Sequence, residues 1–589
     1  MDMTWDLSVF YKGFEDPAFL ADMESLAVLA QQGQTIVKEE LAAEQKLPLL
    51  VRHLETYHEK LMRTYMYCQL IMSVDAENQQ AFQYLERVST LSVDYEVFVS
   101  ACKRYVGTVH NLEALIAADP ELRKNSFALL EAREQASHML EEGMERWLLR
   151  MSLSGGDSFS KLRDQLIGTL TVEMDGESHP LPAVRGMAFD PDPAVRKKAY
   201  EAELASYKKI TLPMSFCLGS IKGEALTMCE ARKYPDILTQ QLVEARMDHE
   251  TLNAMWAACR EAFPDFRRYL KAKARYLGHT NGLPFYDLFA PVGKSTKKYS
   301  VEEARDLVVD TFQKAHPNMA RFMAHAFDNR WIDMLPKQGK TGGAFCASNY
   351  DLKLSRILTN FMGSFSDVST LAHELGHAWH NECNREYPLM MTEYTMPLAE
   401  TASTFNETLL SQTVLKAADD ELAFSILEGS LLEATQCIVD IYSRFLFETA
   451  VFEARKTHTP SVDELRAMMI SAQKEAYGDG LDPDVLHPDM WVGKVHYYSV
   501  GLHFYNFPYA FGLLFGLSVY KKFEEEGASF LPQYDAFLGR CGTDTVANVA
   551  ASVGIDVRSE ETWRKALNVL RGEVDTFEKL VDQRLAAKP

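Results

Sequence analysis

The stretch 371–380 constrains this chain more than any other part of its sequence. It contains the pattern H-E-x-x-H, in which His373 and His377 stand four residues apart. On an α-helix, positions four apart differ by only about 40° around the axis, so both imidazoles lie on one face and can share one ion. Two nitrogen ligands from one rigid helix suit Zn²⁺. Glu374 is rotated aside, where a carboxylate can act as general base toward a water molecule rather than bind the metal.

The residues around this motif predict a helix that packs closely against another segment. No proline interrupts 368–383, and Ser366 or Asp367 can cap the start of a helix there. Gly376 is the one weak helix former, and its missing side chain would let a neighbouring segment approach. The pair Tyr387-Pro388 predicts that the helix has ended by this point, because a residue before proline disfavours the α region.

The third metal ligand must come from a different part of the chain. A histidine at the H-E-x-x-H-x-x-G-x-x-H spacing is absent, because Cys383 occupies that position, and a ligand Glu after eighteen residues would fall on Met396. A second helix is expected over 397–414, since Pro397 suits a first helical position. Glu400 lies one turn into this helix, beside small residues that permit close packing. We therefore expect Glu400 to be the third ligand.

Two polar residues are candidates for orienting the ligands by hydrogen bonds. Glu407 follows Glu400 by seven residues on the same helix face, and His380 lies on the His373 and His377 face one turn further on. Groups of this kind fix the tautomer and orientation of ligand histidines. A polar residue within a packed helix pair explains either position equally well.

The motif and the segment after it resemble a known family. The sequences T-L-A-H-E-L-G-H-A-W-H and L-A-E-T-A-S-T-F-N-E are similar to those of the M3 family of zinc peptidases, and most of all to its oligoendopeptidase F branch. The twenty-two residues between His377 and Glu400 are similar to the family's long ligand gap. The resemblance implies a mainly α, two-lobed shell around a deep central channel, with one zinc ion at the bottom. It also implies cleavage of short unstructured peptides.

An aromatic stretch, 491–520, is expected to contribute to the reaction. Peptide hydrolysis requires donors for the oxyanion that forms at the attacked carbonyl, and in the M3 family a C-terminal His followed by Tyr residues plays this part. The five-residue interval after Trp491 points to His496, with Tyr505 and Tyr509 as the phenols. The His-to-Tyr spacing departs from that of the family, and His503 is a rival.

A glycine-rich loop, 339–343, lies before the metal-motif helix. It lacks the G-x-x-x-x-G-K-[ST] spacing of a phosphate loop. Residues 344–347 and 357–361 predict two short strands, hence a small β-sheet beside that helix. A strand edge can hold an extended peptide through main-chain hydrogen bonds. Residues 342–344 are therefore candidates for binding substrate backbone, and a purely structural turn is the alternative.

The rest of the chain is predicted to be almost wholly helical, with a boundary near residue 190. In residues 169–174, polar and apolar side chains alternate as in a strand, and Asp175-Gly176 follows, which predicts a hairpin turn. Asp192-Pro193 then predicts a helix start. We expect an N-terminal helical lobe over 1–190 and a catalytic zinc metallopeptidase domain over 191–589.

Composition excludes several classes of protein. The net charge of −22 argues against a nucleic-acid partner. The sequence contains no uninterrupted run of eighteen apolar residues, so no membrane span is expected. The opening 1–6 has no basic region followed by an apolar run, so no signal peptide is expected. The nine cysteines are scattered, odd in number and without C-x-x-C. They fit reduced thiols in a cytoplasmic protein.

These observations predict a zinc-dependent endopeptidase acting on short oligopeptides, with Glu374 moving the proton from water to the leaving amine. A dipeptidyl carboxypeptidase is one alternative, and it would need a cationic group for the substrate C-terminus. A zinc-containing peptide-binding protein without catalysis is another, against which the intact Glu374 argues.

Overall fold

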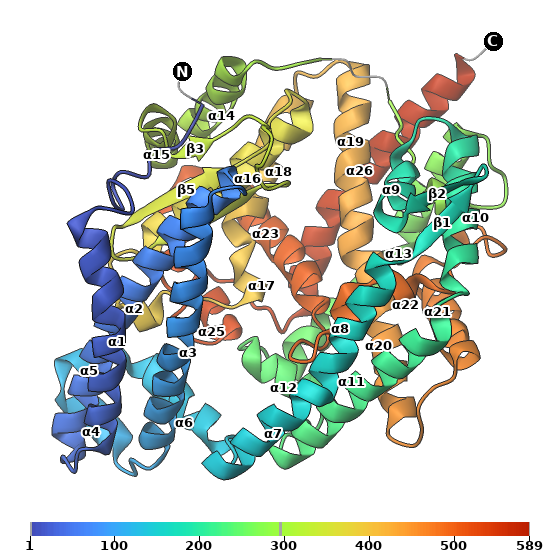
Figure 1. Ribbon diagram of the computed structural model, residues 1–589. Coiled ribbons are helices and arrows are strands. Elements are labelled where there is room, and N and C mark those ends of the chain that lie inside the picture. Colours follow the sequence, from blue (N-terminus) through green and yellow to red (C-terminus); the bar gives the residue numbers. More distant parts are fainter. Residues whose placement is uncertain (1–2, 294–296, 588–589) are drawn as a thin grey trace. The chain divides into compact units, whose positions relative to one another are not determined.

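Helices dominate the computed structural model, which describes residues 3–293 and 297–587 (Figure 1). The density of contacts divides the chain into two compact units, each built from three segments. Unit 1 contains 3–139, 297–413 and 522–554, and unit 2 contains 140–293, 414–521 and 555–587. The mainly α prediction is confirmed. The boundary expected near residue 190 stays a prediction.

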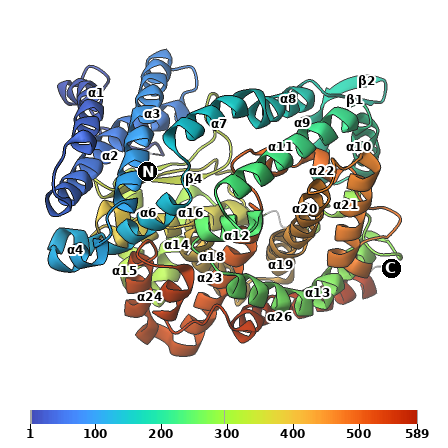
Figure 2. The ribbon, with the colours of Figure 1, turned by 90° about the horizontal axis from the view of Figure 1, so that it is seen from below.

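Three long helices open unit 1. They are α1 (Pro17–Lys38), α2 (Ala43–Val74) and α3 (Gln79–Gly107), and Figures 1 and 2 show them side by side. Asp16 caps α1 by accepting a hydrogen bond from the backbone N–H of Ala18. Apolar residues at helical spacing form the core between the three helices. Shorter helices complete this unit: α4 (Leu112–Ala118), α5 (Pro120–Lys124), α6 (Ser126–Ser137), α14 (Val301–Ala315), α15 (Pro317–Asp328), α24 (Leu531–Gly539) and α25 (Val546–Ala551).

A small sheet precedes the metal-motif helix, as predicted, but it has three strands where two were expected, and the strand expected over 357–361 begins and ends three residues earlier. Its strands are β3 (Ile332–Asp333), β4 (Phe345–Asn349) and β5 (Leu354–Leu358), in the order β3-β5-β4. β3 runs parallel to β5 and β4 runs antiparallel to it. β4 is thus an edge strand, and both β4 and β5 pack against the helix that follows.

The metal-motif helix is α16 (Phe365–Asn384), and its cap differs from the expected one. Ser364 is the N-cap: its hydroxyl accepts from the backbone N–H of Asp367, whose carboxylate accepts from the backbone N–H of Ser364. The expectation that Ser366 or Asp367 is the cap was wrong. Asp367 occupies the third helical position of a reciprocal capping box, and the helix therefore begins earlier.

The helix expected over 397–414 is broken where Glu400 lies. α17 (Met396–Ala399) ends at Glu400, whose φ of −88° and ψ of 6° depart from helical values, and α18 (Thr401–Leu415) follows. Gly376 of α16 faces this junction, and a Cβ at that position would lie 2.7 Å from the carbonyl oxygen of Ala402. The close approach expected of Gly376 is confirmed.

Unit 2 begins with helices and a hairpin. β1 (Thr171–Met174) pairs antiparallel with β2 (Glu177–Pro180) through Asp175 and Gly176, both at positive φ (58° and 78°), as a tight hairpin turn requires. Asp192 caps α10 (Pro193–Tyr207), so both predictions for this region are confirmed. Its other early elements are α7 (Glu142–Ser154), α8 (Gly156–Gly168), α9 (Leu181–Gly186), η1 (Met187–Phe189), α11 (Thr211–Ala231), α12 (Ile237–Glu244), α13 (His249–Leu277) and η2 (Phe285–Asp287).

The later helices of unit 2 include α26 (Glu560–Ala586), which packs along α13 (Figure 2). A π-helical segment, η4 (Thr435–Asp440), joins α19 to α20. The remaining elements are α19 (Asp420–Ala434), α20 (Ile441–Arg455), α21 (Val462–Tyr477), the 3-10 helix η5 (Gly478–Gly480), α22 (Met490–Gly493), the 3-10 helix η6 (Val495–Tyr498) and α23 (Phe507–Glu526), whose last residues belong to unit 1.

Within the described residues, one helical stretch, Asp420–Arg455, is long and apolar enough by composition to cross a membrane, and an eighteen-residue window of it has a mean hydropathy of 1.3. Of that window, 56% is buried inside the structure, as in the core helix of a globular protein. All nine cysteines are free thiols. Of the opening stretch 1–6, the first two residues lie outside the described part of the chain.

Candidate metal centre and its surroundings

His373, His377 and Glu400 come together in unit 1. His373 Nε2 lies 3.1 Å from His377 Nε2, and Glu400 Oε2 lies 3.2 Å and 3.4 Å from these two nitrogens. α16 presents the histidines on one face, and the break between α17 and α18 presents the carboxylate to them. It is the one group of three potential metal-binding side chains found within the described residues.

The triangle of donor atoms fits a metal ion. Ligand bonds of about 2.0–2.1 Å in a tetrahedron place the ligand atoms about 3.3–3.4 Å from one another. The three observed separations, 3.1–3.4 Å, are close to that spacing. Three ligands leave the fourth corner of a tetrahedron open, as catalytic sites do.

Two further residues hold the candidate ligands in place. Glu407 Oε2 lies 3.3 Å from Nδ1 of His373, so Nδ1 can donate to this carboxylate while Nε2 keeps its lone pair for a metal. The hydroxyl of Ser403 donates to Glu400 Oε2 at 2.7 Å. The sequence predicted Glu407 as one of two candidates for orienting the ligands, the other being His380. It did not predict the hydrogen bond from Ser403, which counted only as one of the small residues beside Glu400.

Glu374 is buried beside the three donors, with 6% of its surface exposed. Burial raises the pKa of its carboxyl group, while His373 and His377 act in the opposite direction. A raised pKa brings a carboxylate closer to the range in which it can both accept and return a proton. Cys346 of β4 lies close by. Its burial, together with the charge of Glu374, raises its pKa to about 12, so this thiol stays protonated.

No hydrogen bond joins His380 to the candidate ligands among the described residues. Its ring stacks face to face on that of Tyr394, with centroids 4.0 Å apart and an interplanar angle of 3°. Burial lowers its pKa to about 3, and the charge of His377 acts in the same direction. Its packing fits the alternative kept from the sequence, a satisfied polar group in a packed helix pair. Neither ring nitrogen has a hydrogen-bond partner within the described chain, however, so that alternative stays a prediction.

The glycine-rich loop leads into the edge strand β4. Gly343 has a φ of +80°, a conformation that proline cannot adopt and that other side chains adopt at a cost. The side chain of Asn360 donates to the carbonyl oxygens of Thr341 and Gly343, at 3.0 and 2.8 Å. These two carbonyls are therefore engaged within the protein. A peptide adding to this edge would use the main chain of β4 itself.

The residues expected to stabilise the oxyanion form a cluster in unit 2. The ring of His496, on η6, stacks on Tyr505 with centroids 5.4 Å apart, and Tyr505 meets Tyr509 edge to face at 5.7 Å. All three side chains are partly exposed. Burial lowers the pKa of His496, as does the charge of Arg444.

The rival His503 has a different environment. It is buried, and its Nδ1 lies 3.2 Å from the ammonium nitrogen of Lys222, which is itself paired with Glu448. The next residue, Phe504, has a φ of +50°, which is strained for a bulky side chain. Its backbone N–H donates to Glu448 Oε2 at 3.1 Å, which helps to hold this conformation.

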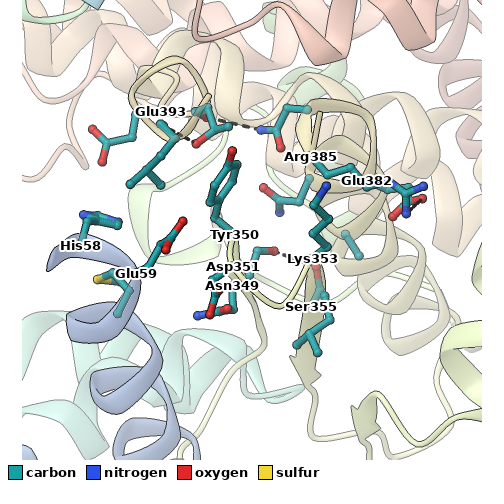
Figure 3. Close-up of a pocket in the computed structure, with 18 of the residues that line it drawn as sticks. His58, Glu59, Asn349, Tyr350, Asp351, Lys353, Ser355, Glu382, Arg385 and Glu393 are labelled. Atoms are coloured by element: carbon teal, nitrogen blue, oxygen red, sulfur yellow. Dashed lines mark hydrogen bonds and ion pairs between the residues drawn. The ribbon is translucent and has the colours of Figure 1, made fainter. Parts of the chain in front are cut away.

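A small pocket of about 140 Å³ lies in unit 1 against the C-terminal half of α16 (Figure 3). Lys353, Arg385 and Glu382 lie on one side of Tyr350, and His58, Glu59 and Glu393 lie on the other. Both cations are paired: Lys353 lies 3.3 Å from Glu386, and Arg385 lies 2.6 Å from Glu382. The hydroxyl of Tyr350 donates to the carbonyl oxygen of Tyr387 at 2.6 Å.

Comparisons with known proteins show that this chain is similar to oligopeptidases. A Bacillus subtilis protein, Oligopeptidase PepF, is 24% identical over 546 residues, covering 89% of this chain and 80% of the relative. An oligoendopeptidase F homologue from Borreliella burgdorferi is 23% identical over 98% of both chains. The crystal structure of a provisionally assigned peptidase from Chlamydophila abortus has a TM-score of 0.86 at 24% identity, covering 98% of both chains. That of oligoendopeptidase F from Enterococcus faecium has a TM-score of 0.70 at 17% identity, covering 96% of this chain and 99% of that one. These two likenesses show the fold.

Family profiles cover most of the chain. The profile of Oligopeptidase F matches residues 110–171. The profile of Peptidase family M3 matches residues 187–569, which include every residue of the candidate centre. The chain is therefore a peptide hydrolase that belongs to peptidase family M3, a family of metallopeptidases.

Proposed function

We propose that this protein is a zinc-dependent endopeptidase that hydrolyses short oligopeptides. The observation that carries the proposal is the convergence of His373, His377 and Glu400 on one point, with the buried carboxylate of Glu374 beside them. Two imidazoles and one carboxylate are a donor set typical of catalytic zinc, and one ion accounts for all three. Oligopeptidase F relatives support short, unstructured peptides as substrates.

The residues of the metal centre in unit 1 each have a role in this proposal. Zn²⁺ bound at the three donors would supply a Lewis acid and lower the pKa of a water molecule. Glu374 accepts the proton of the attacking water and returns it to the amine of the leaving peptide. Glu407 keeps the Nε2 lone pair of His373 directed at the ion, and Ser403 orients the carboxylate of Glu400.

The ring cluster of unit 2 is proposed to stabilise the oxyanion that develops at the attacked carbonyl. His496, Tyr505 and Tyr509 are proposed as its hydrogen-bond donors, because they form one partly exposed ring cluster and carry N–H and O–H groups. The buried His503 is the competing donor. Variants of the two histidines distinguish them, as set out in the Discussion.

The alternative of a dipeptidyl carboxypeptidase needs a cation to bind the substrate C-terminus. The two cations of the pocket beside α16, Lys353 and Arg385, are already engaged with glutamates. Nothing in that pocket therefore favours exopeptidase activity over endopeptidase activity. A cytoplasmic location is part of the proposal, and the nine free thiols support it.

The test is cleavage of a mixed set of short peptides blocked at both ends, followed by mass spectrometry. We expect internal cuts that disappear with a chelator and return with zinc. Glu374→Gln should keep the zinc and lose about 10²–10⁴-fold in kcat. Glu382→Gln, two turns further along α16, is the matched control and should retain activity.

Three outcomes would overturn the proposal. Release of dipeptides from free C-termini, with blocked peptides left intact, would establish the carboxypeptidase reaction. Retained turnover in Glu374→Gln would show that this carboxylate is not the base. Absence of any cleavage with zinc bound would favour a peptide-binding protein.

A further inference from the structure

A second, larger cavity of about 460 Å³ lies within unit 2. Its walls come from α9, η1, α10, η2, η4 and α22, and Figures 1 and 2 show α9, α10 and α22 close together. Its volume lies in the range of small-molecule sites. The last of these elements leads directly into η6, which carries His496.

Aromatic side chains form much of the wall. The ring of His487 meets Tyr200 at 5.8 Å, Tyr207 at 6.2 Å and Phe285 at 5.0 Å, each measured between centroids. Phe189 lines the same cavity and keeps 60% of its surface exposed. A planar or apolar group would be well accommodated among these rings.

Most charged groups of the wall are neutralised within the protein. Glu203 accepts from the hydroxyl of Tyr207 at 2.7 Å and lies 3.5 Å from Arg185. The guanidinium of Arg196 bonds to Asp287 at 2.7 Å, in a fully buried pair. Asp440, on the π-helical segment η4, is paired with Arg444. These pairs leave little net charge on the wall.

Lys494 is the exception. It lines the cavity. No hydrogen bond or ion pair within the described residues involves its ammonium group, although the charges of Asp440 and Glu203 act on it. A second polar group is also unsatisfied: His487 is 4% exposed, and its Nδ1 has no hydrogen-bond partner in the described chain. Buried polar groups are rarely left unpaired, so the Nδ1 of His487 indicates a ligand atom at this point of the cavity. Lys494 is partly exposed and supplies a cation in the same cavity.

We infer that this cavity is a binding site for a small amphipathic carboxylate, whose anion pairs with Lys494 and whose aromatic or apolar body lies among Tyr200, Phe285 and Phe189. An amide or carbonyl group of the ligand would reach His487. A free peptide C-terminus with an apolar last residue has this chemistry, and so does an aromatic acid without a peptide bond. The inference is independent of the zinc assignment.

The experiment is calorimetric titration of the metal-loaded enzyme with two probes, the tripeptide Gly-Gly-Phe and 3-phenylpropionate. N-acetylphenylalanine amide, which has the ring but no carboxylate, serves as the neutral comparison. We expect one site per chain for at least one acid and at least tenfold weaker binding of the amide. The tighter of the two acids identifies whether the site takes peptide C-termini or aromatic acids in general.

Single substitutions test whether the acid binds in the cavity. Lys494→Met should weaken the acid at least tenfold, and Lys474→Met, an exposed lysine of the same unit, should change it less than twofold. Phe189→Ser, at an exposed position where loss of folding is not expected, should weaken it several-fold. Chelating the metal distinguishes the two possible binding places: an acid bound in the cavity should still bind after chelation, whereas an acid bound to the metal should not.

The inference is overturned by binding that disappears on chelation and persists in Lys494→Met, since that result places the acid on the metal. It is equally overturned if the amide binds as well as the acids, or if neither acid binds at millimolar concentration.

Discussion

Gly376 of α16 and Ala402 of α18 are in direct backbone contact: a Cβ added at residue 376 would lie 2.7 Å from the carbonyl oxygen of Ala402 and 2.8 Å from Cα of Ser403. Both obstacles are backbone atoms, which cannot move aside as a side chain can. The separation of the two helices, and hence the position of Glu400 relative to the two histidines, therefore depends on a glycine.

Gly376→Ala should move α18 away from α16. We expect a loss of about 1–3 kcal/mol in the free energy of unfolding, as for an overpacked core, and weaker zinc binding. Denaturant unfolding and zinc competition with a chromogenic chelator measure the two effects. Gly572→Ala is the control, because a Cβ there meets nothing within 4 Å. Unchanged zinc affinity in Gly376→Ala would show that the helix separation does not set the metal site.

Glu407→Gln should weaken the metal site without removing a ligand. An amide can accept the hydrogen bond of His373 Nδ1 but supplies no charge, so we expect zinc affinity to fall about 10–100-fold. Zinc competition at constant pH measures it. If the affinity stays within twofold, Glu407 is only a packed polar residue, the alternative that the sequence left open.

The two histidines of unit 2 should respond differently to replacement. His496→Ala removes a partly exposed ring, so we expect kcat to fall about 10²–10³-fold with zinc content and melting temperature unchanged. His503→Ala leaves a cavity and removes a neighbour of the buried Lys222, so its main effect should be on stability. A folded, zinc-loaded His503→Gln without turnover, beside an active His496→Ala, would transfer the role to His503.

Carboxylate binding in the cavity of unit 2 should depend on pH. Burial, followed by the charge of Arg444, lowers the pKa of Lys494 to about 8. Arg185 acts in the same direction, while Asp440 and Glu203 oppose it. Binding requires the ammonium form, so affinity should be full below pH 8 and fall about tenfold per pH unit as the pH rises above it. Titration from pH 6.5 to pH 9.5 measures the slope. The amide probe and Lys494→Met should show no such slope, and a flat profile for the acid would exclude Lys494 as its partner.

Local patterns in the sequence were enough to predict the elements that carry the metal centre. The H-E-x-x-H spacing places two imidazoles on one helix face wherever that helix lies, and Asp175-Gly176 and Asp192-Pro193 specify their turn and cap within a few residues. Glu400 was predicted as the third ligand because few of the carboxylates downstream lie on a segment that can fold back against the two histidines. The cap of α16 was missed by two residues, because Asp367 is equally suited to the cap and to the third helical position.

By itself, therefore, the sequence determined that the chain is mainly helical, which face of α16 carries the two imidazoles, and which glycine permits close packing. Only the tertiary structure decided the break that turns Glu400 toward the histidines, the bond from Ser403 to its carboxylate, and the burial of His503 beside Lys222. It also assembled a cavity from residues as far apart as Phe189 and Lys494. The physical reason is that periodicity and capping act over a few residues, whereas burial and unpaired charge depend on segments hundreds of residues apart.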